Sequence, residues 1–252
     1  MADTLVFCVA LNHYDRIYAA NLDSHRAYAE RHGYAYALVN RPVWATVDEA
    51  VWLKLELLRR ALAAGWRQVL FLDADCALQA AAPALDQAAA ATASVCLAPG
   101  FSGNLNSGVI LVRNDEAARA FLERVIGLAD TTVPEQDWGE NGHIIHVGKT
   151  HGGVTLLDRR WNNNADPALA DFIRHYSAGG PMRPLYPFSL GARALQLAVR
   201  TVGKLRKWRG RHRVPQGELR RRLDAIGSWI GTVQGEFAPA WSAAERAAQG
   251  VD

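Results

Sequence analysis

The segment Val69-Leu70-Phe71-Leu72-Asp73-Ala74-Asp75 joins a short apolar run directly to two acidic residues that are separated by one alanine. A continuous apolar run of this length is typical of a buried strand. Residues i and i+2 of extended backbone point to the same side, so both carboxylates can face one point. Such oxygen ligands suit Mg²⁺ or Mn²⁺, which commonly bridge carboxylates and substrate phosphates. The alternative is a turn or helix cap, in which Asp is equally common.

Strands and helices alternate on both sides of this segment. Strands are expected at 5–11, 34–39, 68–72, 94–98 and 109–112. Helices are expected from 17 to a stop at Gly33, and at 51–64, 83–92 and 116–128. This order predicts an α/β fold with a mostly parallel sheet flanked by helices. Ligands of such sheets bind beyond the carboxyl ends of the strands, where we expect loops 12–15, 73–75 and 100–108 to gather.

Composition indicates a globular protein with one substantial core. The chain has 252 residues, of which 50% are hydrophobic and 21% charged, and this balance argues against disorder. No apolar run reaches the roughly 18 to 20 residues of a membrane span, and the N-terminus does not read as a secretory signal. We therefore expect a cytoplasmic protein. Its three cysteines are odd in number and widely spaced, which argues against a disulfide framework or a zinc site.

Positive charge is concentrated near the C-terminus. Residues 191–222 hold eleven Lys and Arg residues and one acid, so the remainder of the chain is acidic. We predict a catalytic domain at 1–187 followed by a basic helical extension at 188–252.

The first part of this extension has helical spacing. Apolar residues recur along one face of 190–211 and basic residues along another, and the apolar set includes Trp208. Such a helix suits peripheral contact with the inner face of an anionic membrane, and we expect this contact through residues 190–213. The alternative is a helix that packs its apolar stripe on the body. Nucleic acid is not expected, because aromatic residues are not interleaved with the charges.

Three further segments carry side chains suited to a ligand site, each with a structural alternative. Asn106 precedes Gly108 and a predicted strand, and its amide can contact a sugar hydroxyl or simply belong to a turn. Gln136 lies between two acids in a run that is also typical of a helix N-terminus. His175 ends a strand-like alternation, where an imidazole is either structural or a Mn²⁺ ligand.

The motifs occur in a fixed order: Trp52-x-Lys54, Phe71-Leu72-Asp73-Ala74-Asp75, Leu105-Asn106-Ser107-Gly108-Val109, Glu135-Gln136-Asp137, Trp161-Asn162 and Ile173-Arg174-His175-Tyr176. In this order the chain resembles retaining glycosyltransferases of the GT-A fold over about residues 5–180. It is most similar to the galactosyl, xylosyl and mannosyl group of yeast mannan and plant xyloglucan enzymes. The glycogenin and lipopolysaccharide galactosyltransferase group is more distantly similar.

The resemblance implies a hexosyl- or pentosyltransferase that uses Mn²⁺, or Mg²⁺, and a UDP- or GDP-sugar. Its implied metal ligands are Asp73, Asp75 and His175. Its implied donor-binding residues are Ala10, Tyr14, Lys54, Asp73, Asn106 and Ser107, with Tyr14 stacking on the base and Lys54 reaching the diphosphate. Its implied catalytic residues are Gln136, near the anomeric carbon, and Asp137.

The resemblance also implies transfer, with retention of anomeric configuration, to a glycan or lipid-linked acceptor of bacterial envelope glycan assembly. The departing phosphate oxygen would then act as the base. Two features depart from the pattern: the run after His175 is one residue longer before Gly179, and a Golgi-type anchor at the N-terminus is not expected.

Two other functions stay open at the level of sequence. A nucleotidyltransferase or nucleotide-sugar hydrolase would usually carry a Gly-rich, basic phosphate loop near the N-terminus, where Ala10-Leu11-Asn12-His13 stands instead. A non-catalytic nucleotide-sugar-binding protein would not need both carboxylates of the Asp-Ala-Asp segment, yet both are present.

Overall fold

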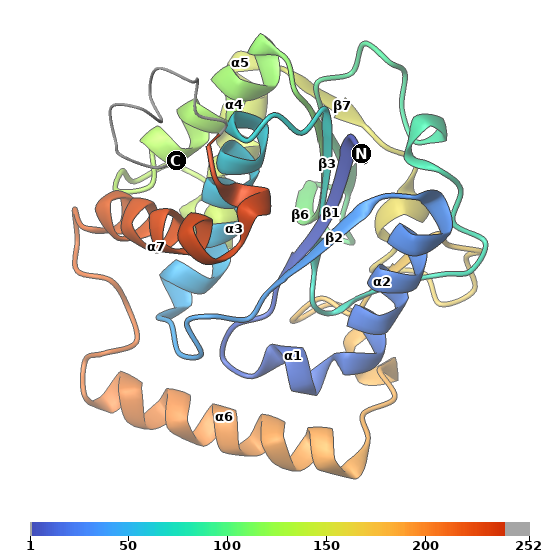
Figure 1. Cartoon of the computed structure of the whole chain (residues 1–252). Helices are drawn as coiled ribbons and strands as arrows, with labels where there is room; N and C mark the ends of the chain where they lie inside the picture. Colours follow the sequence, from blue (N-terminus) through green and yellow to red (C-terminus); the bar gives the residue numbers. More distant parts are fainter. Residues whose placement is uncertain (1, 240–252) are drawn as a thin grey trace.

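A computed structural model of the chain describes residues 2–239. A six-stranded sheet in the order β2-β1-β3-β6-β5-β7 lies between helices (Figure 1). Its strands are β1 (Thr4–Val9), β2 (Ala35–Val39), β3 (Gln68–Asp73), β5 (Val95–Pro99), β6 (Leu105–Arg113) and β7 (Val154–Leu156). The helices are α1 (Tyr14–Ile17), α2 (Ala19–His32), α3 (Val47–Ala63), α4 (Glu116–Gly127), α5 (Glu140–His151), α6 (Leu190–Trp208) and α7 (Leu219–Val233).

The sheet is mixed, because β6 runs antiparallel to both of its neighbours. Strand β1 runs parallel to β2 and β3, and β5 runs parallel to β7, whereas β6 is antiparallel to β3 and β5. The predicted α/β architecture with a mostly parallel sheet is therefore confirmed. The carboxyl ends of β1 and β3 pair directly, Val9 opposite Asp73, so the loops that follow both strands leave the sheet together.

Both faces of the sheet are buried, which explains why its central strands are continuously apolar. Successive side chains alternate between faces. Phe7 and Phe71 belong to the core cluster beneath α3, α4 and α7, whereas Leu70 and Leu72 belong to the opposite cluster with Tyr28 of α2.

A second, two-stranded sheet positions a histidine beside the acidic segment. Strand β4 (Cys76–Leu78) begins directly after Asp75 and pairs antiparallel with β8 (Ile173–His175). Cys76 lies opposite His175 in this pairing. The expected strand that ends in His175 is thus confirmed over Ile173–His175.

Helix α2 holds the backbone of the acidic segment through side chains on one helical face. Asn21 Nδ2 donates to the carbonyl of Ala74 over 3.0 Å, and His25 Nε2 lies 2.7 Å from the carbonyl oxygen of Cys76. These contacts hold both carbonyls from α2, so the turn after β3 is fixed from outside the six-stranded sheet.

The predicted helix at 83–92 is wrong. This stretch contains only the short 3₁₀ turn η1 (Leu85–Gln87). Its carbonyls bond to side chains from other elements instead: Tyr28 donates to Pro83, and Arg113 donates to Ala89 and Ala90. Alanine has high helix propensity, but these tertiary hydrogen bonds outweigh a preference worth only tenths of a kcal/mol per residue.

The predicted extension divides into two different parts within the described residues, and 240–252 lie outside them. Helix α7 and the turn η5 (Gly235–Phe237) pack into the main core, where the Phe237 ring lies 5.3 Å from that of Phe7. Helix α6 contains no buried residue. No helix within 2–239 combines the length and hydropathy needed to span a membrane.

Protonation of His25 should destabilise the fold. His25 is completely buried, and burial lowers its pKa to about 4 from an ordinary 6.5. The unfolded state therefore binds more protons between these values, and stability present above pH 6.5 is lost as the pH falls. Between pH 7 and pH 5 this histidine should cost about 2 kcal/mol of unfolding free energy.

Urea unfolding at both pH values tests this with His25→Gln, whose amide can still donate to the Cys76 carbonyl. The variant should lose about 2 kcal/mol of the pH dependence. The control, His32→Gln on the same helix, should keep it. Equal pH dependence in all three proteins would contradict the prediction.

Candidate functional site

A cavity of about 240 Å³ opens at the carboxyl ends of β1 and β3. Both carboxylates of the acidic segment reach it. The lining residues are Val9, Leu11, Asn12, Tyr14, Val47, Ala50, Val51, Asp73, Ala74 and Asp75. The expected meeting of loops 12–15 and 73–75 at one edge of the sheet is therefore confirmed.

The turn after β1 adopts a restricted conformation that places Tyr14 in the cavity wall. Asn12 and His13 both have positive φ, 57° and 64°, a region that non-glycine residues seldom occupy, although Asn, Asp and His do so more often than others. Asn12 Oδ1 accepts a hydrogen bond from the backbone N–H of Ala45 over 2.9 Å. This contact ties the turn to the segment before α3, and Tyr14 remains 39% exposed.

Asp75 lies between two basic side chains that come from distant parts of the sequence. One carboxylate oxygen lies 3.2 Å from His175 Nε2, and the other accepts a hydrogen bond from Arg183 over 3.0 Å. Burial alone would raise the pKa of Asp75, but His175 and Arg183 together lower it below its ordinary value. Asp75 is therefore a carboxylate at neutral pH.

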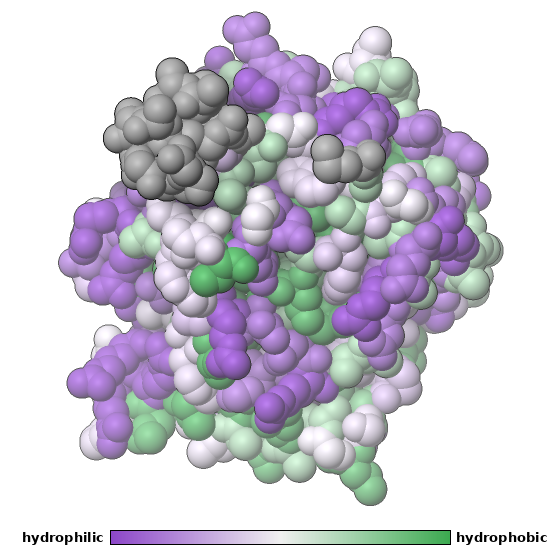
Figure 2. All heavy atoms as spheres, in the orientation of Figure 1, coloured by the Kyte–Doolittle hydropathy of each residue, from purple (hydrophilic) through white to green (hydrophobic). Residues whose placement is uncertain are grey.

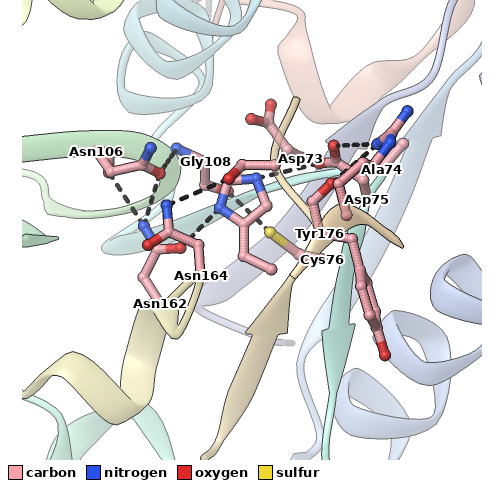
Figure 3. Close-up of polar contacts among 12 residues, drawn as sticks. Asp73, Ala74, Asp75, Cys76, Asn106, Gly108, Asn162, Asn164 and Tyr176 are labelled. Atoms are coloured by element: carbon pink, nitrogen blue, oxygen red, sulfur yellow. Dashed lines mark hydrogen bonds and ion pairs between the residues drawn. The ribbon is translucent and has the colours of Figure 1, made fainter. Parts of the chain in front are cut away.

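The orientation of the His175 imidazole is set by a chain of amides (Figure 3). Asn162, at the end of the turn η3 (Arg159–Asn162), donates through Nδ2 to the backbone oxygen of Asn106 over 3.2 Å. Its Oδ1 must therefore face His175 Nδ1, 2.8 Å away, and accept from it. This bond leaves Nε2 as the ring nitrogen that faces the Asp75 carboxylate, 3.2 Å away, where it could donate to the carboxylate or bind a cation held between them.

Gly108 provides the space in which the imidazole lies. A Cβ at this position would be 2.2 Å from His175 Cε1 and 2.7 Å from Nδ1. Any side chain would displace the ring, so close packing of His175 on the β6 backbone requires glycine here.

Asp73 is held by a different network, centred on the buried ammonium of Lys54. Lys54 Nζ lies 3.5 Å from Asp73 Oδ1, 2.9 Å from Glu140 Oε1 and 3.2 Å from Ser107 Oγ. Burial opposes the charge of Lys54, but Asp73 and Glu140 outweigh it and raise the lysine pKa. Burial in turn raises the pKa of the Asp73 carboxyl, and Lys54 offsets only part of this.

The donor atoms fit a hard divalent cation. Potential ligand atoms of Asp75, Cys76 and His175 lie within 4.8 Å of one another. Burial, together with the charges of Asp75 and Asp73, raises the pKa of the Cys76 thiol. This thiol donates a hydrogen bond to the Gly108 carbonyl, with the sulfur 3.5 Å from the oxygen. A protonated thiol is a poor ligand, which leaves a carboxylate oxygen and an imidazole nitrogen, both suited to Mn²⁺.

Asp73 does not belong to this 4.8 Å cluster, because Lys54 draws its carboxylate toward α3. Figure 3 shows the side chains of Asp73 and Asp75 pointing apart from a shared backbone turn. Both still line the same cavity. The two carboxylates were expected to face one point. They line one cavity, but only Asp75 belongs to the cluster of potential ligand atoms.

Three other residues predicted for the site have no hydrogen bond or ion pair with Asp75 or His175 within the described residues. Ala10 is fully buried, and its N–H bonds to the Val39 carbonyl. Gln136 and Asp137 are exposed on the turn η2 (Gln136–Trp138). Within 2–239, no recorded contact joins their side chains to Asp75 or His175. Their placement at the reaction centre stays a prediction.

Sequence reasoning missed Glu140 and Arg183. Glu140 follows the Gln-Asp pair by three residues, and it is this acid that reaches Lys54. Its single signal is its place as the acid in the first turn of α5. Arg183 is separated from Asp75 by 108 positions, and no spacing rule connects them. The Trp161-Asn162 motif includes Asn162, but no sequence pattern predicts its hydrogen bond with His175.

No protein-family model and no curated protein sequence matches the chain. Among solved structures, a glycosyltransferase involved in the glycosylation of the major capsid of PBCV-1 is similar with a TM-score of 0.55 and 12% identity, over 69% of this chain and 94% of that one. The galactosyltransferase LgtC, solved with donor and acceptor sugar analogs, has a TM-score of 0.47 and 13% identity, over 79% and 95%. The glycosyltransferase GlyE of Streptococcus pneumoniae has 0.46 and 12%, over 73% and 60%.

The first of these similarities, above a TM-score of 0.5, defines the fold. Together with the sheet order, it shows that the chain has the GT-A glycosyltransferase fold, with a basic helical segment after the sheet. At 12% identity the likeness carries the fold alone. The resemblance to the yeast and plant group stays a prediction.

Substitution of Gly108 by Ala should disrupt the His175 pocket. The new Cβ would overlap the imidazole, and overpacking of this kind costs about 1–3 kcal/mol. Thermal unfolding should show a lowered Tm. Gly127→Ala is the matched control, because its Cβ would meet no atom within 4 Å, and its Tm should not fall. A Gly108→Ala protein as stable as the control would show that the ring is free to move aside.

Proposed function

We propose that the chain is a metal-dependent glycosyltransferase. It would move a hexosyl or pentosyl unit from a UDP- or GDP-sugar to a hydroxyl of a glycan or lipid-linked acceptor. The observation that supports this best is the meeting of Asp75 and His175 at 3.2 Å beside a cavity that Asp73 and Asp75 line. On a GT-A fold, that combination of an oxygen and a nitrogen donor at the carboxyl ends of the strands suits a donor site.

Asp75 and His175 would hold the cation, with Asp73 as a third ligand once its carboxylate turns from Lys54. Mn²⁺ or Mg²⁺ in this position neutralises negative charge on a departing nucleoside diphosphate. Arg183 lies on the other side of Asp75 and supplies a second positive charge near the same oxygens. Lys54, only 4% exposed, would position Asp73 and Ser107. Direct contact of its ammonium with the diphosphate remains the prediction from resemblance.

The cavity walls suit the remainder of the donor. Tyr14, 39% exposed in the cavity wall, offers an aromatic ring for stacking on a base, and Asn106 offers an amide beside the proposed metal ligands. We propose that Gln136 and Asp137 complete the sugar and acceptor side. Transfer with retention, with the departing phosphate oxygen as base, is proposed from the resemblance.

Removal of the Asp75 carboxylate should weaken metal-dependent binding of the nucleotide. Wild-type protein should be stabilised by UDP or GDP, and more strongly with Mn²⁺ present, because a ligand that binds only the native state raises Tm by mass action. In Asp75→Asn the Mn²⁺-dependent part should fall at least tenfold in affinity. Thermal shift and isothermal titration with the nucleotides measure it.

The control for this variant is Asp23→Asn, an exposed aspartate on α2 whose side chain is 73% accessible. It should behave as wild type. A panel of nucleotide sugars then separates the remaining functions. Release of a nucleoside diphosphate supports a transferase, and release of a monophosphate would favour a hydrolase or nucleotidyltransferase. Binding without turnover of any donor would favour a non-catalytic protein. Full Mn²⁺-dependent transfer by Asp75→Asn would contradict the metal assignment.

Asn162→Ala keeps all three proposed ligands and removes the acceptor of the His175 Nδ1–H bond, together with the hydrogen bonds from Asn162 to Asn106. Loss of such an outer partner typically weakens metal binding about 10–100-fold. We expect a Mn²⁺ affinity reduced by that factor, measured by titration of the nucleotide-bound protein. Asn104→Ala is the control, because this half-buried asparagine has no side-chain hydrogen bond to Asn162 or His175. An unchanged affinity in Asn162→Ala would show that the amide does not orient the ligand.

A further inference from the structure

Helix α6 lies along one edge of the molecule and touches the body with one face (Figure 1). On that face Leu195 and Val199 pack beside the cluster formed by Ile17, Tyr18 and Tyr186. The apolar residues at these positions explain why the helix stays attached. Of the two roles considered for this helix, packing against the catalytic domain is therefore correct for the face that carries Leu195 and Val199.

A second set of apolar residues faces solvent. Leu190, Leu197, Leu205 and Trp208 are 86%, 67%, 45% and 81% exposed. With Ala194 and Thr201 between them, they recur every three or four residues, so they form a single stripe along the helix. Figure 2 shows apolar residues gathered along the lower edge, where α6 lies. The stripe runs about 28 Å, the length of this 19-residue helix.

Basic side chains border the stripe. They are Arg193, Arg200, Lys204 and Lys207, all exposed, and α6 contains no acidic residue. No ion pair with any of the four is recorded among residues 2–239, whereas Arg213 and Arg222, beyond the helix, are paired with acids. Uncompensated positive charge beside an exposed apolar stripe is complementary to a surface that is apolar within and negative at its rim.

We propose that α6 docks the protein on an anionic lipid bilayer, with Leu197 and Trp208 in the interface and the basic row against the headgroup phosphates. A second copy of this chain fits the surface poorly, because a two-fold contact would bring basic rows toward each other. An anionic bilayer matches both features of α6, because its acyl chains can take up the apolar stripe and its headgroup phosphates can pair with the basic row.

Docking through α6 would also place the candidate donor cavity near the bilayer. A neighbouring cavity of about 350 Å³ is lined by Val199, Gly203 and Lys204 of α6, and it shares Asn12 and Tyr14 with the donor cavity. This part of the inference rests on the proposed function: the acceptor hydroxyl would belong to a molecule held at the membrane.

Co-sedimentation of the full chain with lipid vesicles tests the proposal. Vesicles with 30% phosphatidylglycerol should bind the wild type, and pure phosphatidylcholine vesicles should bind it weakly. Leu197→Gln/Trp208→Gln should lower the partition coefficient at least tenfold on anionic vesicles. Arg193→Gln/Arg200→Gln should lower it about fivefold per charge there, and 0.5 M salt should have a similar effect. None of these four residues lines either cavity.

The matched control is Trp229→Gln/Val233→Gln on α7, whose side chains are 44% and 59% exposed. It should bind vesicles as the wild type does. Vesicle binding that is absent in the wild type, or unchanged in the α6 variants, would overturn the proposal. A wild-type dimer that the Leu197→Gln/Trp208→Gln variant makes monomeric would assign the stripe to a second copy instead.

Hydrolysis of the nucleotide-sugar donor, measured on the same preparations without vesicles, separates this inference from the proposed function. All α6 variants should hydrolyse donor at the wild-type rate. Loss of vesicle binding with hydrolysis intact concerns only the docking surface. Vesicle binding by a wild type that turns over no donor would overturn the proposed function and leave the docking surface standing.

Discussion

The antiparallel pairing of β4 with β8 is the constraint on which the site depends. It sets Cys76 opposite His175, so the imidazole meets the Asp75 carboxylate although the two residues are far apart in sequence. The consequences extend to residues on other elements. Gly108 must lack a side chain, and Asn162 must present its oxygen to the ring. A shift of register in this small sheet would separate the carboxylate from the imidazole.

Two charge networks divide the acidic segment between them. Lys54 and Glu140 hold Asp73 on the side of α3, and His175 and Arg183 hold Asp75 on the other side. Each buried charge has an opposite partner, as buried charges require. The arrangement keeps negative oxygens and positive side chains within one small region, where a bound cation and a phosphate group would exchange partners with them.

Helices α6 and α7 have opposite roles although they form one basic stretch of sequence. Helix α7 is structural: Leu223 and Ile230 are in the core, and Arg60 of α3 bonds to Asp224 and Ser228. Helix α6 adds little to the core and exposes apolar residues on its outer face. Deletion of the whole segment after residue 187 would therefore remove part of the hydrophobic core, and only point substitutions separate the two roles.

The sequence by itself determined the α/β class, the strand that carries Asp73, the helices around it and the basic amphipathic character of α6. These depend on hydrophobic period and on residues close together in the chain, which a single sequence records. It also suggested that Asp75 and His175 belong to one site, through the order of motifs. The tertiary structure decided which acid pairs with Lys54, that Arg183 flanks Asp75, that 83–92 is not a helix, and which face of α6 is free. Each of these is a contact between elements distant in sequence, and it depends on strand register and helix packing, which local patterns do not encode.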